Sequence, residues 1–339
     1  MRQTPNAGGT RAVVARADAA VARPAGPETL SGWRRRHHRK GLLYVLPAAL
    51  LFALMIVYPI ARSFYLSFFD YSILEPDSAR FVGLDNYARL LLQKQNHDPF
   101  WHTLYFTAIF VPPFVGLALL IAMMLNRLKR GSVALRTAIF TPVVVSLAVS
   151  AVMWTLFYNP TFGLAHKLLA GAIGAVNRAA ALLGAGPIAT VPDGGVLADK
   201  GWAMIGIAVM CLWNGIGVNI ILFLVGLQRI PEELYEAAVV DGASGWQRFR
   251  HITLPQLAPT IYLVVLLSLI GAFKLFGQPF IMTGGGPEDS TLTYVMRLYN
   301  LAFKYGRFQL GYASALAYAL ALFIFGISLL VRKLNRPVE

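Results

Sequence analysis

The sequence predicts an all-α integral membrane protein with a core of six transmembrane helices and a helical segment on the cytoplasmic side. Hydrophobic residues make up 57% of the chain and charged residues only 14%, a balance typical of membrane proteins. The apolar residues gather in six stretches. At a rise of about 1.5 Å per residue, roughly 20 helical residues cross a hydrocarbon core of about 30 Å, so each stretch is long enough to span a bilayer.

The six predicted spans run in order along the chain. They cover Leu42 to Leu66, Trp101 to Leu125, Thr137 to Tyr158, Trp202 to Leu227, Ala258 to Met282 and Gly311 to Val331. We therefore expect a transmembrane domain over residues 41–335, preceded by a separate tail.

Basic residues flank alternate ends of these spans. The net charge of +14 would suggest nucleic-acid binding in a soluble domain, but the Lys and Arg residues here lie in short stretches beside apolar runs. The positive-inside rule then places both termini on the cytoplasmic side of a bacterial-type inner membrane. We expect a multi-pass protein in a lipid bilayer, with no nucleic acid as a partner.

Residues 1–40 differ from the rest of the chain in composition. They contain no apolar run, are rich in Ala, Arg and Gly, and end in the basic cluster from Arg34 to Lys40. Such a segment cannot bury enough apolar surface to fold alone, so we predict a disordered basic cytoplasmic tail.

Three longer connections are expected on the outer side. Residues 67–100 contain FVGLDNYARLL, which predicts a turn and then a short amphipathic helix. Residues 159–200 carry an apolar period through Leu164, Leu168 and Leu169, which favours a helix at the membrane surface. In residues 283–310, the run from Gly284 to Pro287 cannot continue a helix.

The polar loop from Pro231 to Pro259 predicts two short helices joined by a glycine corner. Pro231 suits the first helical position, and Gly242 is a typical C-terminal stop. Ser244 and Gln247 form a capping box that starts the second helix. We expect Pro255 to end that helix.

No catalytic or metal site is predicted. The chain has no G-x-x-x-x-G-K-[ST] phosphate loop, no H-E-x-x-H pair and no G-x-S-x-G elbow. Cys211 is the single cysteine and lies in an apolar run, which excludes an intrachain disulfide and favours a packed hydrophobic role. We therefore expect no cofactor on this chain.

A few polar and aromatic residues inside the spans are candidates for a substrate pathway. In the fourth span, Gly215 and Gly217 would let the backbone open beside polar side chains. Amide and charged groups can bind the polar groups of a solute, and aromatic rings can bind its apolar faces. A lysine at membrane depth usually faces the bundle interior or water, so we expect Lys274 to face inward. The candidates are Trp213, Asn214, Asn219, Lys274, Phe276 and Gln278.

Simpler roles stay open for these residues. Asn and Gln side chains can bond to a neighbouring helix, and Lys274 can snorkel to the surface or pair with a partner subunit. One function that such a pathway could serve is that of an ion-coupled secondary transporter. Such transporters typically carry buried carboxylates, and no Asp or Glu lies deep in a span here. A membrane-embedded enzyme would need an acid or metal constellation, which the sequence lacks.

The loop resembles a known motif. Glu236, Ala237, Ala238, Asp241 and Gly242, followed by Ile252, Leu254 and Pro255, are similar to the EAA loop in the permease subunits of binding-protein-dependent ABC importers. FVGLDNY, NPTFG, MTGGGP and GYASA resemble the carbohydrate-uptake branch of that family, which includes permeases for maltose, oligosaccharides and glycerol phosphate. The resemblance extends over residues 40 to 335.

The resemblance implies a role for each part of the loop. It implies a coupling helix that docks on a dimeric cytoplasmic ATPase through Glu236, Ala237, Ala238, Asp241, Gly242, Leu254 and Pro255. It further implies that ATP and Mg²⁺ bind to the partner ATPase. The other implied partners are a second homologous permease subunit and an extracytoplasmic solute-binding protein. The implied substrate is a di- or oligosaccharide, with glycerol phosphate or another small polar solute as the alternative.

Overall fold

The computed structural model describes residues 44–128, 132–192, 194–304, 306 and 308–334. The predicted tail, residues 1–40, lies outside the described residues. The chain forms two units, Met1–Arg62 and Ser63–Glu339. The described residues are mostly helical, which confirms the predicted class.

The first half of the chain contains these elements: the π-helical turn η2 (Ala53–Val57), α3 (Tyr58–Leu66), β1 (Phe69–Asp70), the 3-10 turn η3 (Pro76–Ser78), β2 (Arg80–Phe81), α4 (Asp85–Leu92), the 3-10 turn η4 (Lys94–Asn96), α5 (His97–Arg127), α6 (Ser132–Val144), α7 (Leu147–Phe157) and α8 (Leu164–Leu182). The second half contains the 3-10 turn η5 (Val196–Ala198), α9 (Lys200–Leu227), α10 (Glu232–Val240), α11 (Gly245–Arg248), the π-helical turn η6 (Phe249–Thr253), α12 (Leu254–Gln256), α13 (Ala258–Phe273), α14 (Gly277–Met282), α15 (Tyr294–Phe303) and α16 (Leu310–Leu334).

Four helices are long and apolar enough to cross a membrane, namely Tyr44–Leu66, Lys94–Arg127, Lys200–Leu227 and Leu310–Lys333. The count among the described residues rises to six if each of two bent helix pairs is one span. The third predicted span is one of these pairs, because its two halves, α6 and α7, meet at 98°. Ser146 adopts an extended backbone and caps α7 by accepting a hydrogen bond from the amide of Val149.

The fifth predicted span is not one helix over Ala258 to Met282. Helix α13 ends at Phe273, and α14 begins at Gly277. The 16 residues of α13 are fewer than the roughly 20 that a straight span needs. The predicted continuous helix is therefore wrong at residues 274–276, where the hydroxyl of Thr293 donates to the freed carbonyl of Leu275 over 2.7 Å.

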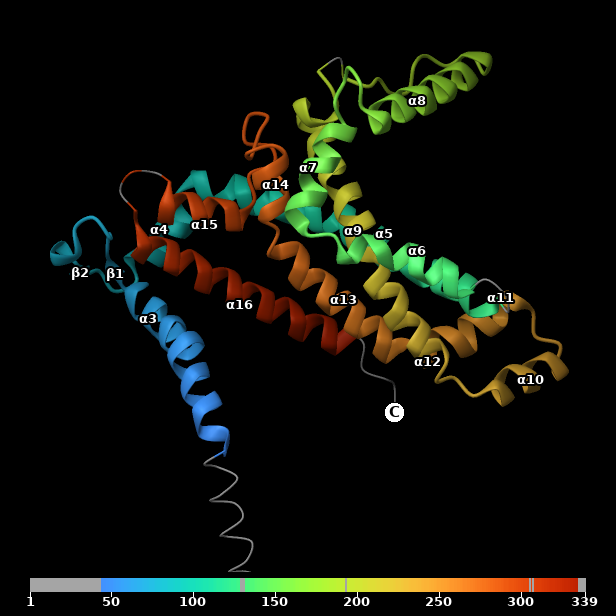
Figure 1. The fold of residues 1–339 in the computed structure, drawn as a ribbon, viewed down its shortest axis with the longest axis horizontal. Coiled ribbons are helices and arrows are strands. Elements are labelled where there is room, and N and C mark those ends of the chain that lie inside the picture. The colour runs from blue at the N-terminus through green and yellow to red at the C-terminus, as the bar shows by residue number, and fades with distance from the viewer. Residues whose placement is uncertain (1–43, 129–131, 193, 305, 307, 335–339) are drawn as a thin grey trace, which may run out of the picture. The chain divides into compact units, whose positions relative to one another are not determined.

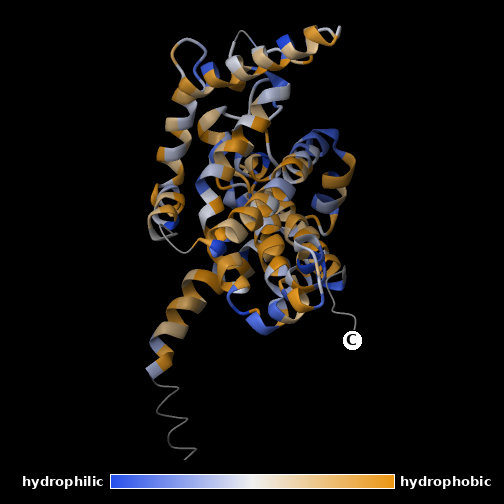
Figure 2. Cartoon of the chain, turned by 90° about the vertical axis from the view of Figure 1, so that its right-hand side faces the viewer, coloured by the Kyte–Doolittle hydropathy of each residue, from blue (hydrophilic) through white to orange (hydrophobic). Residues whose placement is uncertain are grey.

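The core of the second unit forms where α9 packs against α5, α6 and α13 (Figure 1). Phe106, Ile207, Phe223 and Leu257 are almost completely buried there. Hydrophobic residues run along the helices, and hydrophilic residues gather in the connecting segments (Figure 2). This distribution fits helices that contact lipid on their outer surfaces.

The predicted turn and amphipathic helix in FVGLDNYARLL are confirmed. Strands β1 and β2 pair antiparallel with Phe69 opposite Phe81, and Gly83 takes a left-handed φ of 56° before α4 begins. The buried amide of Asn86 donates to the carbonyls of Ser67 and Phe69 and so fixes α4 to the strand. A helix within residues 159–200 is also confirmed, as α8, and the run after Met282 is not helical.

Candidate functional site: the Pro231–Pro259 loop and the core cavity

The predicted glycine corner lies between α10 and α11. Helix α10 ends at Val240, and Gly242, two residues later, has a φ of 75°. The amide of Ala243 donates to the carbonyl of Ala238 over 2.8 Å, and the amide of Gly242 donates to the carbonyl of Val239 over 3.0 Å. These two bonds form a Schellman motif, which satisfies the last carbonyls of the helix. An added Cβ at Gly242 would meet nothing within 4 Å, so the backbone conformation is the reason for glycine there.

The predicted capping box is confirmed. The amide of Ser244 donates to Oε1 of Gln247 over 2.7 Å, and the amide of Gln247 donates to Oγ of Ser244. The Tyr235 and Thr253 hydroxyls form a hydrogen bond of 2.9 Å, which ties α10 to the far end of the second helix. The two helices are therefore held in one fixed arrangement by bonds at the corner and across it.

The second helix ends at Gln256, one residue after Pro255, which agrees with the predicted end to within one residue. Helical backbone continues from Gly245 to Gln256, and a 68° bend at Leu257 leads into α13. Pro255 follows the π-helical turn η6, just as Pro59 follows η2. Proline lacks the amide donor of the α-helical bond, and its ring crowds the carbonyl four residues earlier. A wider π-turn before the proline relieves that conflict and lets the helix continue.

Six of the seven predicted coupling residues are exposed, and Ala238 is half-buried. Ala238, Asp241 and Gly242 form one wall of a hollow of about 330 Å³, and Gln247 and His251 from the second helix line the other. Several apolar side chains beside the hollow are also exposed, above all Val240 at 86% and Trp246 at 66%. An apolar surface with carboxylates at its edge has the composition of a protein docking site.

A cavity of about 280 Å³ lies in the helical core among α5, α9, α13 and α14. Three of the six predicted pathway residues, Asn214, Asn219 and Gln278, line it. Phe106, Phe110 and Phe114 of α5 line the cavity as well, with stacked rings 4.5 and 5.1 Å apart between neighbours. The cavity thus combines amide groups with aromatic faces. The α5 aromatic residues were missed in the sequence because a Phe every four residues in an apolar helix is also typical of ordinary packing.

Two of the amide side chains bond to neighbouring helices. Asn214 donates to the carbonyl of Pro142 over 3.0 Å and to Oγ of Ser150 over 3.1 Å, and so bridges the bend between α6 and α7. Asn219 donates to Oγ of Ser268 on α13 over 3.3 Å. Their oxygen atoms can still accept bonds, so a structural role and a place on the cavity wall coexist.

The expected opening of the backbone at Gly215 and Gly217 is wrong, because α9 is continuous over Lys200–Leu227. The glycines allow close packing instead. An added Cβ at Gly217 would lie 2.9 Å from the carbonyl oxygen of Ile139 on α6, and one at Gly215 would lie 3.2 Å from the ring of Phe114. These glycines bring α9 against α6 and α5.

The remaining predicted pathway residues lie outside the cavity lining. Lys274 caps the C-terminal end of α13 and is exposed on the isolated chain, at the helix break. Phe276 stacks on Phe280 at 5.2 Å. Trp213 packs edge-on against Trp154 at 5.8 Å. Asn214, Asn219 and Gln278 therefore line one cavity, and Trp213, Lys274 and Phe276 are not part of its lining.

No metal centre is present among the described residues, because no group of three His, Cys, Asp or Glu side chains is close enough to hold an ion.

Residues 94–339 match the family model described as "Binding-protein-dependent transport system inner membrane component". The chain belongs to this family. It is 35% identical to the probable ABC transporter permease protein YurN of Bacillus subtilis, over 86% of this chain and 94% of that protein. It is 34% identical to the lactose transport system permease protein LacF of Rhizobium radiobacter, over 88% of this chain and 95% of that protein.

A solved structure supports the same fold. A bacterial ABC transporter involved in the import of the acidic polysaccharide alginate aligns with a TM-score of 0.68 and 22% identity, over 91% of this chain and 99% of that one. The resemblance stated from the EAA loop is thereby confirmed, and the chain is a multi-pass membrane permease of the ABC transporter type.

Proposed function

We propose that this chain is a permease subunit of an ATP-driven importer for a di- or oligosaccharide. In this proposal it forms the substrate path with a second, homologous permease, and both termini lie in the cytoplasm. A dimeric ATPase on the cytoplasmic side binds the loop from Pro231 to Pro259, and an extracytoplasmic binding protein delivers the sugar. ATP hydrolysis takes place on the ATPase, not on this chain.

The observation that carries the proposal is the exposed, rigid helix pair around Gly242. A docking element that transmits motion has to keep its shape, and the Schellman bonds, the capping box and the Tyr235–Thr253 bond supply that rigidity. The second helix leads through the bend at Leu257 into α13, which lines the core cavity. A displacement of the loop would therefore move a wall of the cavity directly.

The sugar assignment rests on the lining of that cavity and on the relatives. Asn214, Asn219 and Gln278 offer amide groups, and the α5 phenylalanine rings offer apolar faces. The relative LacF is a lactose permease by name. An anionic solute such as a glycerol phosphate is the second candidate, because the Lys274 ammonium is exposed at the helix break and could meet a phosphate.

Reconstitution of the four-component complex in proteoliposomes tests the proposal. We expect ATP-dependent uptake of a disaccharide that requires the binding protein. Replacing Gly242 by tryptophan is expected to abolish uptake and to uncouple ATP hydrolysis from substrate, because a bulky L-residue at a φ of 75° distorts the docking corner. Gly242→Asn is the control, because asparagine takes the left-handed conformation more readily than other non-glycine residues.

Normal uptake and normal substrate-stimulated hydrolysis by the Gly242→Trp complex would contradict the coupling role. Uptake that persists without ATP but collapses with the ion gradient would instead favour an ion-coupled secondary transporter.

A further inference from the structure

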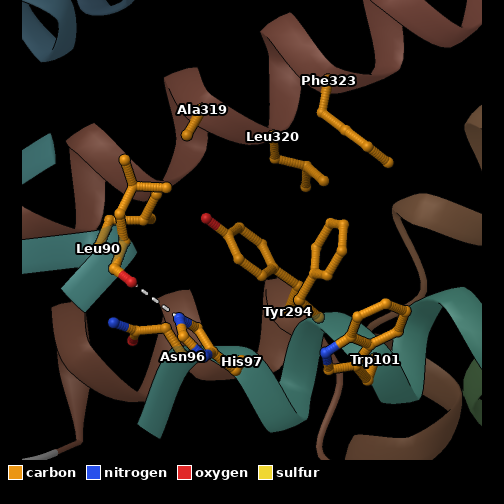
Figure 3. Close-up of a pocket in the computed structure, with 10 residues that line it drawn as sticks. Leu90, Asn96, His97, Trp101, Tyr294, Ala319, Leu320 and Phe323 are labelled. Carbon is orange, nitrogen blue, oxygen red and sulfur yellow. Dashed lines mark hydrogen bonds between the residues drawn. The ribbon is translucent and has the colours of Figure 1, made fainter. Parts of the chain in front are cut away.

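A second, larger cavity lies away from the core cavity and from the Pro231–Pro259 loop. Its volume is about 470 Å³, and it lies between α4, the start of α5, α15 and α16. Its walls are mainly apolar and aromatic, with contributions from Leu90, Phe100, Tyr294, Leu320 and Phe323 (Figure 3). None of the predicted pathway residues lines it.

The two ends of this cavity differ in polarity. Asn96 and His97 lie at one end, and Leu320 and Phe323 lie at the other (Figure 3). His97 stands at the first residue of α5, where its ring donates to the carbonyl of Leu91 over 2.9 Å. Phe323 lies 13 residues beyond Leu310, the first residue of α16, which is roughly 20 Å along the helix at its usual rise. The polar end thus lies at the start of α5, and the apolar end lies midway along α16, where the Phe323 ring packs against Phe100 at 5.1 Å.

The rim of the cavity continues into the apolar outer surface of the spans. Leu91 is 71% exposed and Trp101 is 60% exposed, both at the rim. On α16, Leu322 and Phe325 are exposed beside the cavity-lining residues. Trp is enriched where a span meets the membrane surface, so Trp101 marks the level of the lipid headgroups. The cavity therefore opens toward lipid rather than toward the core of the bundle.

We propose that this cavity binds one acyl chain of a bilayer phospholipid, with the headgroup near the exposed His97 and the chain end near Phe323. The gradient from polar to apolar matches an amphiphile and runs in the same direction as the bilayer itself. A sugar is excluded as the occupant, because the walls offer too few hydrogen-bonding groups for its hydroxyls. The inference does not depend on the transported solute.

The bound chain would fill the space that separates four elements. Helix α4 is fixed to β1 through Asn86, and α15 contacts α16 through the second core cluster of Tyr294, Tyr312 and Leu316. An acyl chain in the cavity would add apolar contacts with α4 and with the pair of helices α15 and α16. An empty cavity of this size would leave its lining without partner atoms.

Photo-labelling tests the proposal on the full complex in lipid nanodiscs. The probe is a phospholipid with a diazirine in its acyl chain, and the labelled peptides are identified by mass spectrometry. We expect adducts on the peptides that contain Phe100, Trp101 and Phe323. The exposed residues Leu329 and Leu330 on the far part of α16 give the reference level of labelling by bulk lipid, and adducts on the cavity peptides should exceed it.

A pair of variants on α16 separates a bound lipid from bulk lipid. Ala319→Trp places an indole in the cavity, whereas Ala321→Trp places the same indole on the exposed surface of the helix. We expect labelling of the cavity peptides to be lost in Ala319→Trp and kept in Ala321→Trp. Thermal unfolding of both variants shows whether each is folded.

Undiminished labelling in a folded Ala319→Trp complex would overturn the proposal. Cross-links from the cavity peptides to another protein segment, whether a partner subunit or residues 1–43, would overturn it as well. A wild-type complex whose cavity peptides are labelled as expected but which takes up no disaccharide would count against the proposed function alone. The two proposals can therefore fail separately.

Discussion

Replacing Gly217 by alanine is expected to lower the melting temperature of the chain, whereas the same change at Gly271 is expected to raise it. The new methyl group at Gly217 would lie 2.9 Å from the carbonyl oxygen of Ile139 and 3.3 Å from Cα of Phe140. Both are backbone atoms of α6, so relief requires a shift of the whole helix. At Gly271 on α13 the methyl group would meet nothing within 4 Å.

The magnitudes follow from two opposing effects. Overpacking costs typically about 1–3 kcal/mol. Alanine in place of glycine in a helix interior gains about 0.5–1 kcal/mol. The net effect at Gly217 is a loss of up to about 2.5 kcal/mol, and at Gly271 a gain of up to about 1 kcal/mol. Gly215→Ala should fall between them, because its methyl group meets only the ring of Phe114, a side chain that can move.

The assay is thermal unfolding of the purified proteins in one detergent, with intrinsic fluorescence as the readout. A change of 1 kcal/mol moves the melting temperature by roughly 2–4 °C in domains of 150–250 residues, which is well resolved. A melting temperature for Gly217→Ala at or above that of the wild type would refute the close approach of α9 and α6.

The other predictions concern the corner at Gly242 and the bend at α6 and α7. Gly242→Ala is expected to reduce sugar-stimulated ATP hydrolysis by the complex, because the left-handed conformation costs an ordinary L-residue roughly 1–2 kcal/mol. Gly242→Asn should retain more activity and Gly245→Ala nearly all of it, and equal activity of all three variants would contradict the backbone argument. Asn214→Leu is expected to lower the melting temperature, because the buried Ser150 hydroxyl loses a donor at about 1–3 kcal/mol, whereas the Pro142 carbonyl keeps its bond from the amide of Val145. The control Asn126→Leu changes an exposed residue at the end of α5 and should leave the melting temperature unchanged.

The predictions that succeeded rest on local interactions. The Schellman corner at Gly242 and the capping box of Ser244 with Gln247 form within a few residues, so the local sequence is enough to specify them. The turn at Gly83 before α4 belongs to the same class. Apolar run length likewise predicted the uninterrupted helices α5, α9 and α16, because the bilayer thickness sets the length of a span.

The predictions that failed concern breaks in helices. Residues 274–276 interrupt the fifth span, although nothing in the run LIGAFKLFGQ predicts a break. The break is stabilised by Thr293, which lies further along the chain and donates a hydrogen bond to the Leu275 carbonyl. Gly215 and Gly217 were expected to open the backbone of α9, which is instead continuous over Lys200–Leu227. A break in apolar surroundings depends on partners from other helices, and hydropathy carries no information about them.

The sequence by itself determined the membrane class, the number of apolar stretches and the family, because composition, run length and the EAA pattern are properties of short segments. Only the tertiary structure decided which pathway candidates share a cavity. Asn214, Asn219 and Gln278 line one cavity, while Lys274 lies at a helix break and is not part of its lining. That outcome depends on where α6, α9 and α13 cross, and glycine contacts and interhelical hydrogen bonds fix those crossings.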